Sequence, residues 1–61
     1  MKLADLKSYA QAIAQQYPEL AEDIRDVVSL AEDEIEEGSP EERECELAKT
    51  DIQDLLTELN E

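Results

Sequence analysis

The sequence predicts an all-α fold with three helices. Its apolar residues recur every three or four positions, which is the spacing of one face of a helix. Pro18 and the segment Gly38-Ser39-Pro40 interrupt this spacing and divide the chain into three stretches. A chain of 61 residues is large enough for one domain only, so residues 1–61 are expected to form a single small helical domain.

The first helix is expected at about residues 3–16. Its apolar face consists of Leu3, Leu6, Ala10, Ile13 and Tyr17. Pro18 should end it, because proline has no amide hydrogen and disfavours a helical backbone for the residue before it. This abrupt junction allows the first helix either to fold over the other two or to reach a second subunit.

The second helix is expected at about residues 18–37. Proline is favoured at the first position of a helix, and Glu19 and Glu22 follow where the helix dipole favours acidic residues. The apolar face is wide, which suits a helix that packs against two neighbours. It consists of Leu20, Ala21, Ile24, Val27, Val28, Ala31 and Ile35.

The third helix is expected at about residues 40–59. Gly38 suits the left-handed conformation that follows a helix end, Ser39 can cap the next helix, and Glu42 would complete a capping box. The apolar face that follows consists of Cys45, Ala48, Ile52, Leu55, Leu56 and Leu59. Because a connection of about two residues forces two helices to run antiparallel, the last two helices are expected to form a hairpin.

The small size of the chain predicts a homodimeric helical bundle. A single core in a chain this short supplies only about 3–5 kcal/mol, so small proteins add a disulfide, a metal or a second subunit. Cys45 is the only cysteine and there is no histidine, so neither an internal disulfide nor a structural zinc site is expected. In size and hairpin architecture the chain resembles the small plasmid copy-number regulators, which dimerise as four-helix bundles. Those proteins bind RNA through basic side chains that this hairpin lacks, so the resemblance implies a fold but not a function.

The net charge of −13 is distributed unevenly. Residues 1–17 contain two lysines and one aspartate and sum to +1, whereas residues 18–61 contain seventeen carboxylates and three cations and sum to −14. Such a polyanion repels nucleic acids and anionic membranes and attracts basic surfaces. We therefore expect a basic protein as the partner, with no direct binding to nucleic acid or membrane.

The residue types argue against an enzyme. Without histidine the usual general base is missing, and the glutamates around Cys45 would raise the pKa of its thiol and weaken it as a nucleophile. The carboxylates lack the spacing of a calcium loop and the Glu-x-x-His pairs of a di-iron bundle. We expect no catalytic residues, no metal site and no cofactor. The chain has no targeting signal and no apolar run of about 20 residues, and its single thiol favours a reducing compartment, so a soluble cytoplasmic protein is expected.

The acidic face of the hairpin is the predicted partner-binding surface. Helical residues rise about 1.5 Å each, so carboxylates every three or four positions approximate the charge spacing along a DNA strand. Acidic residues also crowd the negative end of the second helix, where a surface chosen for stability would have lysine or arginine. The predicted face consists of Asp23, Asp26, Asp33, Glu34 and Glu37 on the second helix and Asp51, Asp54 and Glu58 on the third.

Leu30 and Leu47 are the predicted apolar anchor of this face. Neither lies on the apolar face of its helix, and the hairpin pairing brings the two positions opposite each other. An apolar contact inside an acidic rim has the anatomy of a binding hot spot. The alternative is a minor contact covered by the first helix or by acidic side-chain stems.

These features predict a small, non-enzymatic regulatory protein that binds a basic protein, in the manner of a DNA-mimic inhibitor. The chain is similar in acidity and size to the phage-encoded DNA mimics that inhibit restriction, CRISPR or nucleoid proteins. One alternative is an oligomerisation module whose acidity serves only solubility or adaptation to high salt. Another is an antitoxin-like partner of a basic toxin.

Overall fold

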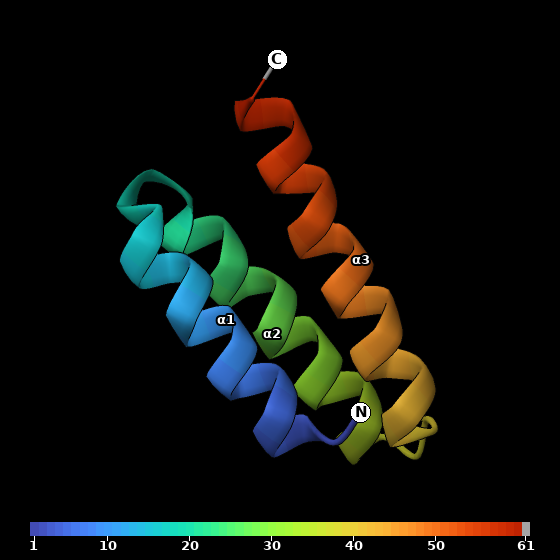
Figure 1. Ribbon diagram of the computed structural model, residues 1–61. Helices are drawn as coiled ribbons and strands as arrows, with labels where there is room; N and C mark the ends of the chain where they lie inside the picture. Colours follow the sequence, from blue (N-terminus) through green and yellow to red (C-terminus); the bar gives the residue numbers. More distant parts are fainter. Residues whose placement is uncertain (61) are drawn as a thin grey trace.

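A computed structural model describes residues 1–60, and Glu61, the last residue of the predicted domain, lies outside the described residues. Residues 1–60 form three α-helices and no strand, which confirms the all-α prediction. The helices are α1 (Leu3–Gln16), α2 (Ala21–Glu36) and α3 (Glu41–Leu59), and a short 3₁₀ turn, η1 (Pro18–Leu20), joins the first two (Figure 1). Each α-helix packs against the other two, so α1 folds back within its own chain.

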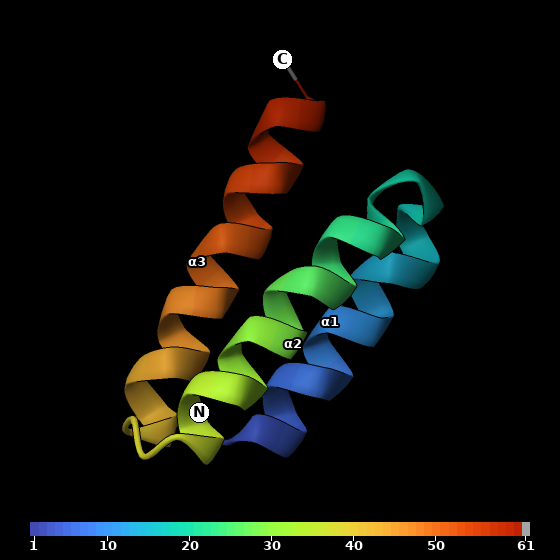
Figure 2. The ribbon, with the colours of Figure 1, turned by 180° about the vertical axis from the view of Figure 1, so that it is seen from behind.

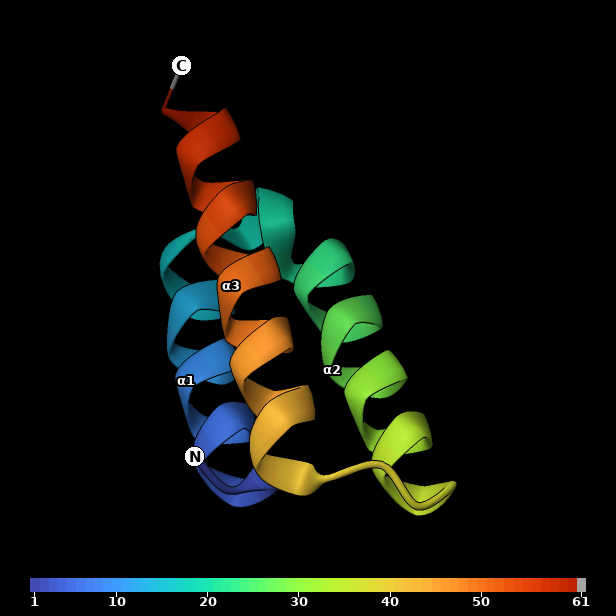
Figure 3. The same cartoon turned by 90° about the vertical axis from the view of Figure 1, so that its right-hand side faces the viewer.

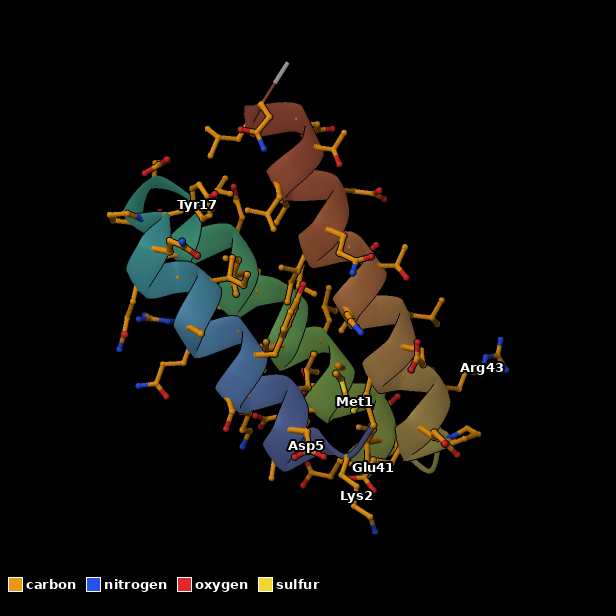
Figure 4. The ribbon with its side chains drawn as sticks, in the orientation of Figure 1. Met1, Lys2, Asp5, Tyr17, Glu41 and Arg43 are labelled. Carbon is orange, nitrogen blue, oxygen red and sulfur yellow. The ribbon has the colours of Figure 1, made fainter. Side chains whose placement is uncertain are left out.

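Pro18 separates α1 from α2, but it does not begin α2. Tyr17 leaves the helical region, with φ −127° and ψ 76°, and its side chain lies at the junction between the two helices (Figure 4). The amide of Leu20 then donates to the carbonyl of Tyr17 at 2.9 Å. A bond to the third residue back winds the chain more tightly than an α-helix does. The predicted start at residue 18 is therefore wrong by three residues, and α2 begins at Ala21.

The turn after α2 is built on Gly38. Its φ of +113° is open to glycine and strained for other residues, even though a Cβ at this position would meet no atom within 4 Å. The amide of Ser39 donates to the carbonyl of Glu34 at 3.0 Å, and the amide of Gly38 donates to that of Ile35 at 3.1 Å. These two bonds form a Schellman motif, which satisfies the last carbonyls of the helix. The helix itself ends at Glu36, one residue before the predicted end.

The predicted capping box at the start of α3 is wrong. Pro40 is still extended, with φ −61° and ψ 124°, so α3 begins one residue later at Glu41, and no side chain caps it. The extended backbone of Pro40 makes that residue, and not Ser39, the one that precedes the first helical turn.

Glu41 instead caps α1. Its carboxylate Oε2 accepts a hydrogen bond from the amide of Leu3 at 2.9 Å, across 38 positions of the sequence. Lys2, the residue before α1, makes no side-chain cap of its own. Figure 4 shows Met1, Lys2, Asp5 and Glu41 gathered at this end of the molecule. The start of α1 and the start of α3 are thus joined by a carboxylate.

The core between the three helices is small. Four of its eight buried residues are large aliphatic ones, and the rest are alanines and a fully buried cysteine; together they are Leu6, Ala10, Leu20, Ile24, Ala31, Cys45, Ala48 and Ile52. Small residues at these positions let the helices approach closely. The long dimension of the molecule is 35 Å, and the last turns of α3 project beyond the junction at Tyr17–Leu20 (Figures 1–3). Leu59, on this projecting part, is 41% exposed.

Within residues 1–60, no helix combines the length and the hydropathy that crossing a membrane requires.

Candidate functional site

A surface groove of about 160 Å³ runs between α2 and α3. Each helix contributes four residues with the same spacing of i, i+3, i+4 and i+7. They are Val27, Leu30, Ala31 and Glu34 from α2 and Glu44, Leu47, Ala48 and Asp51 from α3. Residues with this spacing lie along one side of a helix. The groove is therefore lined by one side of α2 and one side of α3, and not by a loop. We call it the α2–α3 groove.

The α2–α3 groove has an apolar interior with two projecting leucines. Ala31 and Ala48 are 4% and 3% exposed and belong to the protein core, so they form the floor. Leu30 and Leu47 are 64% and 51% exposed, which is more than any other large apolar side chain in residues 1–60. The two leucines singled out by the sequence pattern therefore line one groove, and both are open to solvent.

Three carboxylates line the same groove. Glu34 and Asp51 belong to the predicted acidic face, whereas Glu44 does not. Glu44 lies four residues before Ala48 and three before Leu47. This spacing places it on the same strip of α3, and it is the sequence signal that could have identified Glu44 as a groove residue. Its side chain is partly buried, which places it deeper in the surface than Glu34 and Asp51.

The remaining predicted acidic residues do not line the groove. All of them are exposed: Asp23, Asp26, Asp33, Glu37, Asp54 and Glu58. Asp54 and Glu58 continue the strip of α3 that contains Asp51, with the same spacing of three and four. Asp23 extends the strip of α2, while the other three residues share the strip of Leu30 on the outer side of that helix. The predicted face is thus a groove with acidic extensions.

The cations of the chain are directed elsewhere. Lys7 of α1 forms an ion pair with Glu32 of α2, with 2.9 Å between Nζ and Oε1. Lys49 lies over the ring of Tyr9 at 5.8 Å from its centroid, so it faces α1. Arg43 points away from the body of the molecule (Figure 4). Among the residues that line the α2–α3 groove, none is a lysine or an arginine.

A second groove of about 340 Å³ lies between α1 and α2. Small and polar residues predominate in it, and it contains the Lys7–Glu32 ion pair and Arg25. Its lining consists of Lys7, Ala10, Gln11, Ala14, Ala21, Ile24, Arg25, Val28, Ser29 and Glu32. We call it the α1–α2 groove. It has no exposed leucine and its charges are mixed.

Cys45 carries the one thiol of the sequence, and it lies in the core. Cys45 is fully buried, and burial raises the pKa of its thiol, with a further increase from the carboxylate of Glu41. A raised pKa disfavours the thiolate, which is the reactive form. Within residues 1–60 there is also no group of three or more histidine, cysteine, aspartate or glutamate side chains placed to hold a metal ion.

No protein-family model, curated protein or solved structure matches this chain.

Proposed function

We propose that this protein is a non-enzymatic binding protein that engages a basic protein through the α2–α3 groove and thereby inhibits or regulates it. One observation carries the proposal. The two most exposed large apolar side chains, Leu30 and Leu47, line a single groove together with three carboxylates and no cation.

The apolar part of the groove supplies the affinity in this proposal. Binding energy concentrates in a few apolar side chains that are surrounded by a polar rim. Leu30 and Leu47 are the anchors, and Glu34, Glu44 and Asp51 are the rim. In this proposal α2 and α3 form an antiparallel hairpin, and the groove-lining sides of the two helices together form one contact surface.

The acidic surface determines which class of partner binds in this proposal. A field of one sign attracts basic surfaces and accelerates their encounter. In addition, α1, α2 and α3 each lack a basic residue in the last turn, where a cation would stabilise the helix. The charges at the C-terminal ends of the helices are thus not arranged for helix stability. A target that normally binds nucleic acid fits this surface best, because carboxylates at helical spacing resemble the phosphates of one strand.

A homodimeric helical bundle is the second candidate, and a different observation favours it. Only eight of residues 1–60 are buried, and the apolar residues in the last turns of α3 are at most partly buried: Leu55, Leu56 and Leu59. A second copy that covers this end would supply the stabilisation that small chains need. In that case the acidity is only solubilising.

The test is a pull-down from host lysate on the immobilised protein, eluted in steps of increasing salt. We expect a nucleic-acid-binding protein to be released at moderate salt, because salt screens the attraction between exposed charges. Leu30→Glu and Leu47→Glu should retain the helical content by circular dichroism and lose the captured protein.

Leu59→Glu is the matched control, because Leu59 is also exposed but does not line the groove. If the resin retains only this protein itself, through high salt, the homodimer is the correct reading. If capture survives both leucine substitutions in the groove, the groove is not the binding surface.

A further inference from the structure

We propose that the occupant of the α2–α3 groove is a basic amphipathic helix of the partner protein. This inference rests on the proposed function and gives the partner a secondary structure and a residue pattern. It follows from the shape of the groove, from its charges and from the faces that a second copy of this chain can offer.

The shape of the groove favours a helix over an extended peptide. An extended peptide gains most of its affinity from backbone hydrogen bonds to a free sheet edge. Residues 1–60 contain no strand, and the backbone groups on both sides of the groove are bonded within α2 and α3. A furrow between two helices is instead where the side-chain ridge of a third helix packs.

The size of the groove sets the size of the contact. A cavity of about 150 Å³ holds a benzene-sized group, so a hollow of about 160 Å³ accepts one or two aliphatic side chains of a partner. The strip of α2 that lines the groove, from Val27 to Glu34, covers seven residue steps, which is about 10 Å at 1.5 Å per residue. The part of a partner helix that contacts the groove is therefore about two turns long.

The carboxylates set the charge pattern of the occupant. Glu34 lies on the α2 side of the groove, and Glu44 and Asp51 lie on the α3 side. Glu44 and Asp51 are seven residues apart, so they stand two helical turns from each other. The complementary helix has an apolar stripe with lysine or arginine on both flanks, and two of these cations are seven residues apart on one flank.

A second copy of this chain does not fit this description. Helices α2 and α3 would place carboxylates against carboxylates. Residues 1–17 have a net charge of +1, but the solvent side of α1 has only small, polar or charged residues: Ala4, Asp5, Lys7, Ser8, Gln11, Ala12, Gln15 and Gln16. It therefore has no apolar anchor for the groove.

The experiment uses the full chain and three labelled synthetic peptides of fifteen residues, with fluorescence anisotropy as the binding measurement. The first peptide has leucines at helical spacing, alanines, and lysines on both flanks. The second has the same composition in scrambled order, and the third has glutamate in place of lysine. We expect the first peptide to bind and to become helical by circular dichroism, the second to bind at least about tenfold more weakly, and the third not to bind.

Two pairs of variants locate the contact. Leu47→Glu should weaken the first peptide by about tenfold or more, and Leu59→Glu should leave it unchanged. Glu34→Gln, Glu44→Gln and Asp51→Asn combined should weaken it more than Glu19→Gln, Glu22→Gln and Glu36→Gln combined, although both triple variants remove three charges. Leu47→Ala replaces Leu47→Glu if the latter loses helical content.

Failure of this inference is distinguishable from failure of the proposed function. If the scrambled peptide binds as tightly as the first and both triple variants behave alike, binding depends on charge alone, and the helix-in-groove inference is overturned while the proposed function stands. If none of the peptides binds at low salt but the groove variants abolish capture of a basic protein, the occupant is not a helix. If neither peptide nor basic protein binds, both proposals fall.

Discussion

Helix α2 has a groove on each side, and the two grooves differ in volume, in the exposure of their apolar side chains and in charge. The α1–α2 groove measures about 340 Å³, but an ion pair spans it and its large apolar residue, Ile24, is only 2% exposed. The α2–α3 groove measures about 160 Å³, yet it presents two exposed leucines and charge of a single sign. Under the proposed function, volume is a poor guide to the protein-binding surface of this molecule. Exposed apolar side chains with a uniform rim are the better one.

The largest expected effect separates the two grooves by stability. Ile24→Ala should reduce the free energy of unfolding by about 2–5 kcal/mol, because it removes a buried side chain and leaves a cavity. Leu30→Ala should change it by only about 0.5 kcal/mol or less, because Leu30 is exposed. Urea unfolding followed by circular dichroism measures both values. A loss at Leu30 as large as that at Ile24 would show that the leucine is structural and not a binding anchor.

The next effect concerns the attachment of α1, which forms one wall of the larger groove. Glu41→Ala should destabilise the protein by about 1 kcal/mol, the usual cost of a lost helix cap, because the amide of Leu3 loses its acceptor. Glu41→Gln retains an oxygen that can accept this bond and should lose less. Thermal and urea unfolding give the comparison. Equal stability of the wild type and both variants would mean that the hydrogen bond contributes nothing.

A smaller effect is expected from the ion pair across the α1–α2 groove. The side chains of Lys7 and Glu32 are 53% and 42% exposed. Solvent screens such a pair, so Lys7→Met should cost no more than about 0.5 kcal/mol. The measurement is urea unfolding at low and moderate salt. A loss well above 1 kcal/mol would show that the ion pair holds the α1–α2 groove together.

The smallest expected effect on stability at neutral pH concerns Cys45, which lies beneath the α2–α3 groove. Cys45 lies one turn before Ala48, and burial raises the pKa of its thiol. The folded state therefore favours the protonated thiol, and its contribution to stability is complete below the ordinary thiol pKa of about 8.5. This contribution should be lost as the pH rises through the higher pKa of the folded state.

Cys45→Ala provides the control for this pH effect. The variant removes the titrating thiol and leaves the rest of the chain unchanged. Stability curves between pH 7 and pH 11 should therefore fall more steeply for the wild type than for the variant. Curves with the same slope would mean that the thiol does not contribute.

The sequence predicted the features of this molecule that depend on local patterns. The bounds of α1 follow from its apolar spacing and from Pro18, and the turn after α2 follows from Gly38. The predicted adjacency of positions 30 and 47 needed only the helical period and the turn. These features are local because each is decided within one or two helical turns of the residues concerned.

The features that the sequence could not predict depend on contacts between distant segments. The capping box failed because Pro40 can be extended or helical, and its neighbours in sequence do not decide which. The cap on α1 comes from Glu41, 38 residues away from Leu3, and no periodic pattern connects these positions. The acidic face was predicted as rows of carboxylates along each helix, and this prediction missed Glu44. The place of Glu44 in the groove depends on how closely α2 and α3 approach each other.

The hydrogen bond between Leu3 and Glu41 can form only late in the synthesis of the chain. The amide of Leu3 leaves the ribosome first, and its acceptor is added 38 residues later. At synthesis rates of about 5–20 residues per second, this interval lasts about 2–8 s. During that time the nascent first helix has neither its cap nor α3 to pack against. A binding surface that needs the complete three-helix framework is therefore absent until synthesis has passed the end of α3 at Leu59.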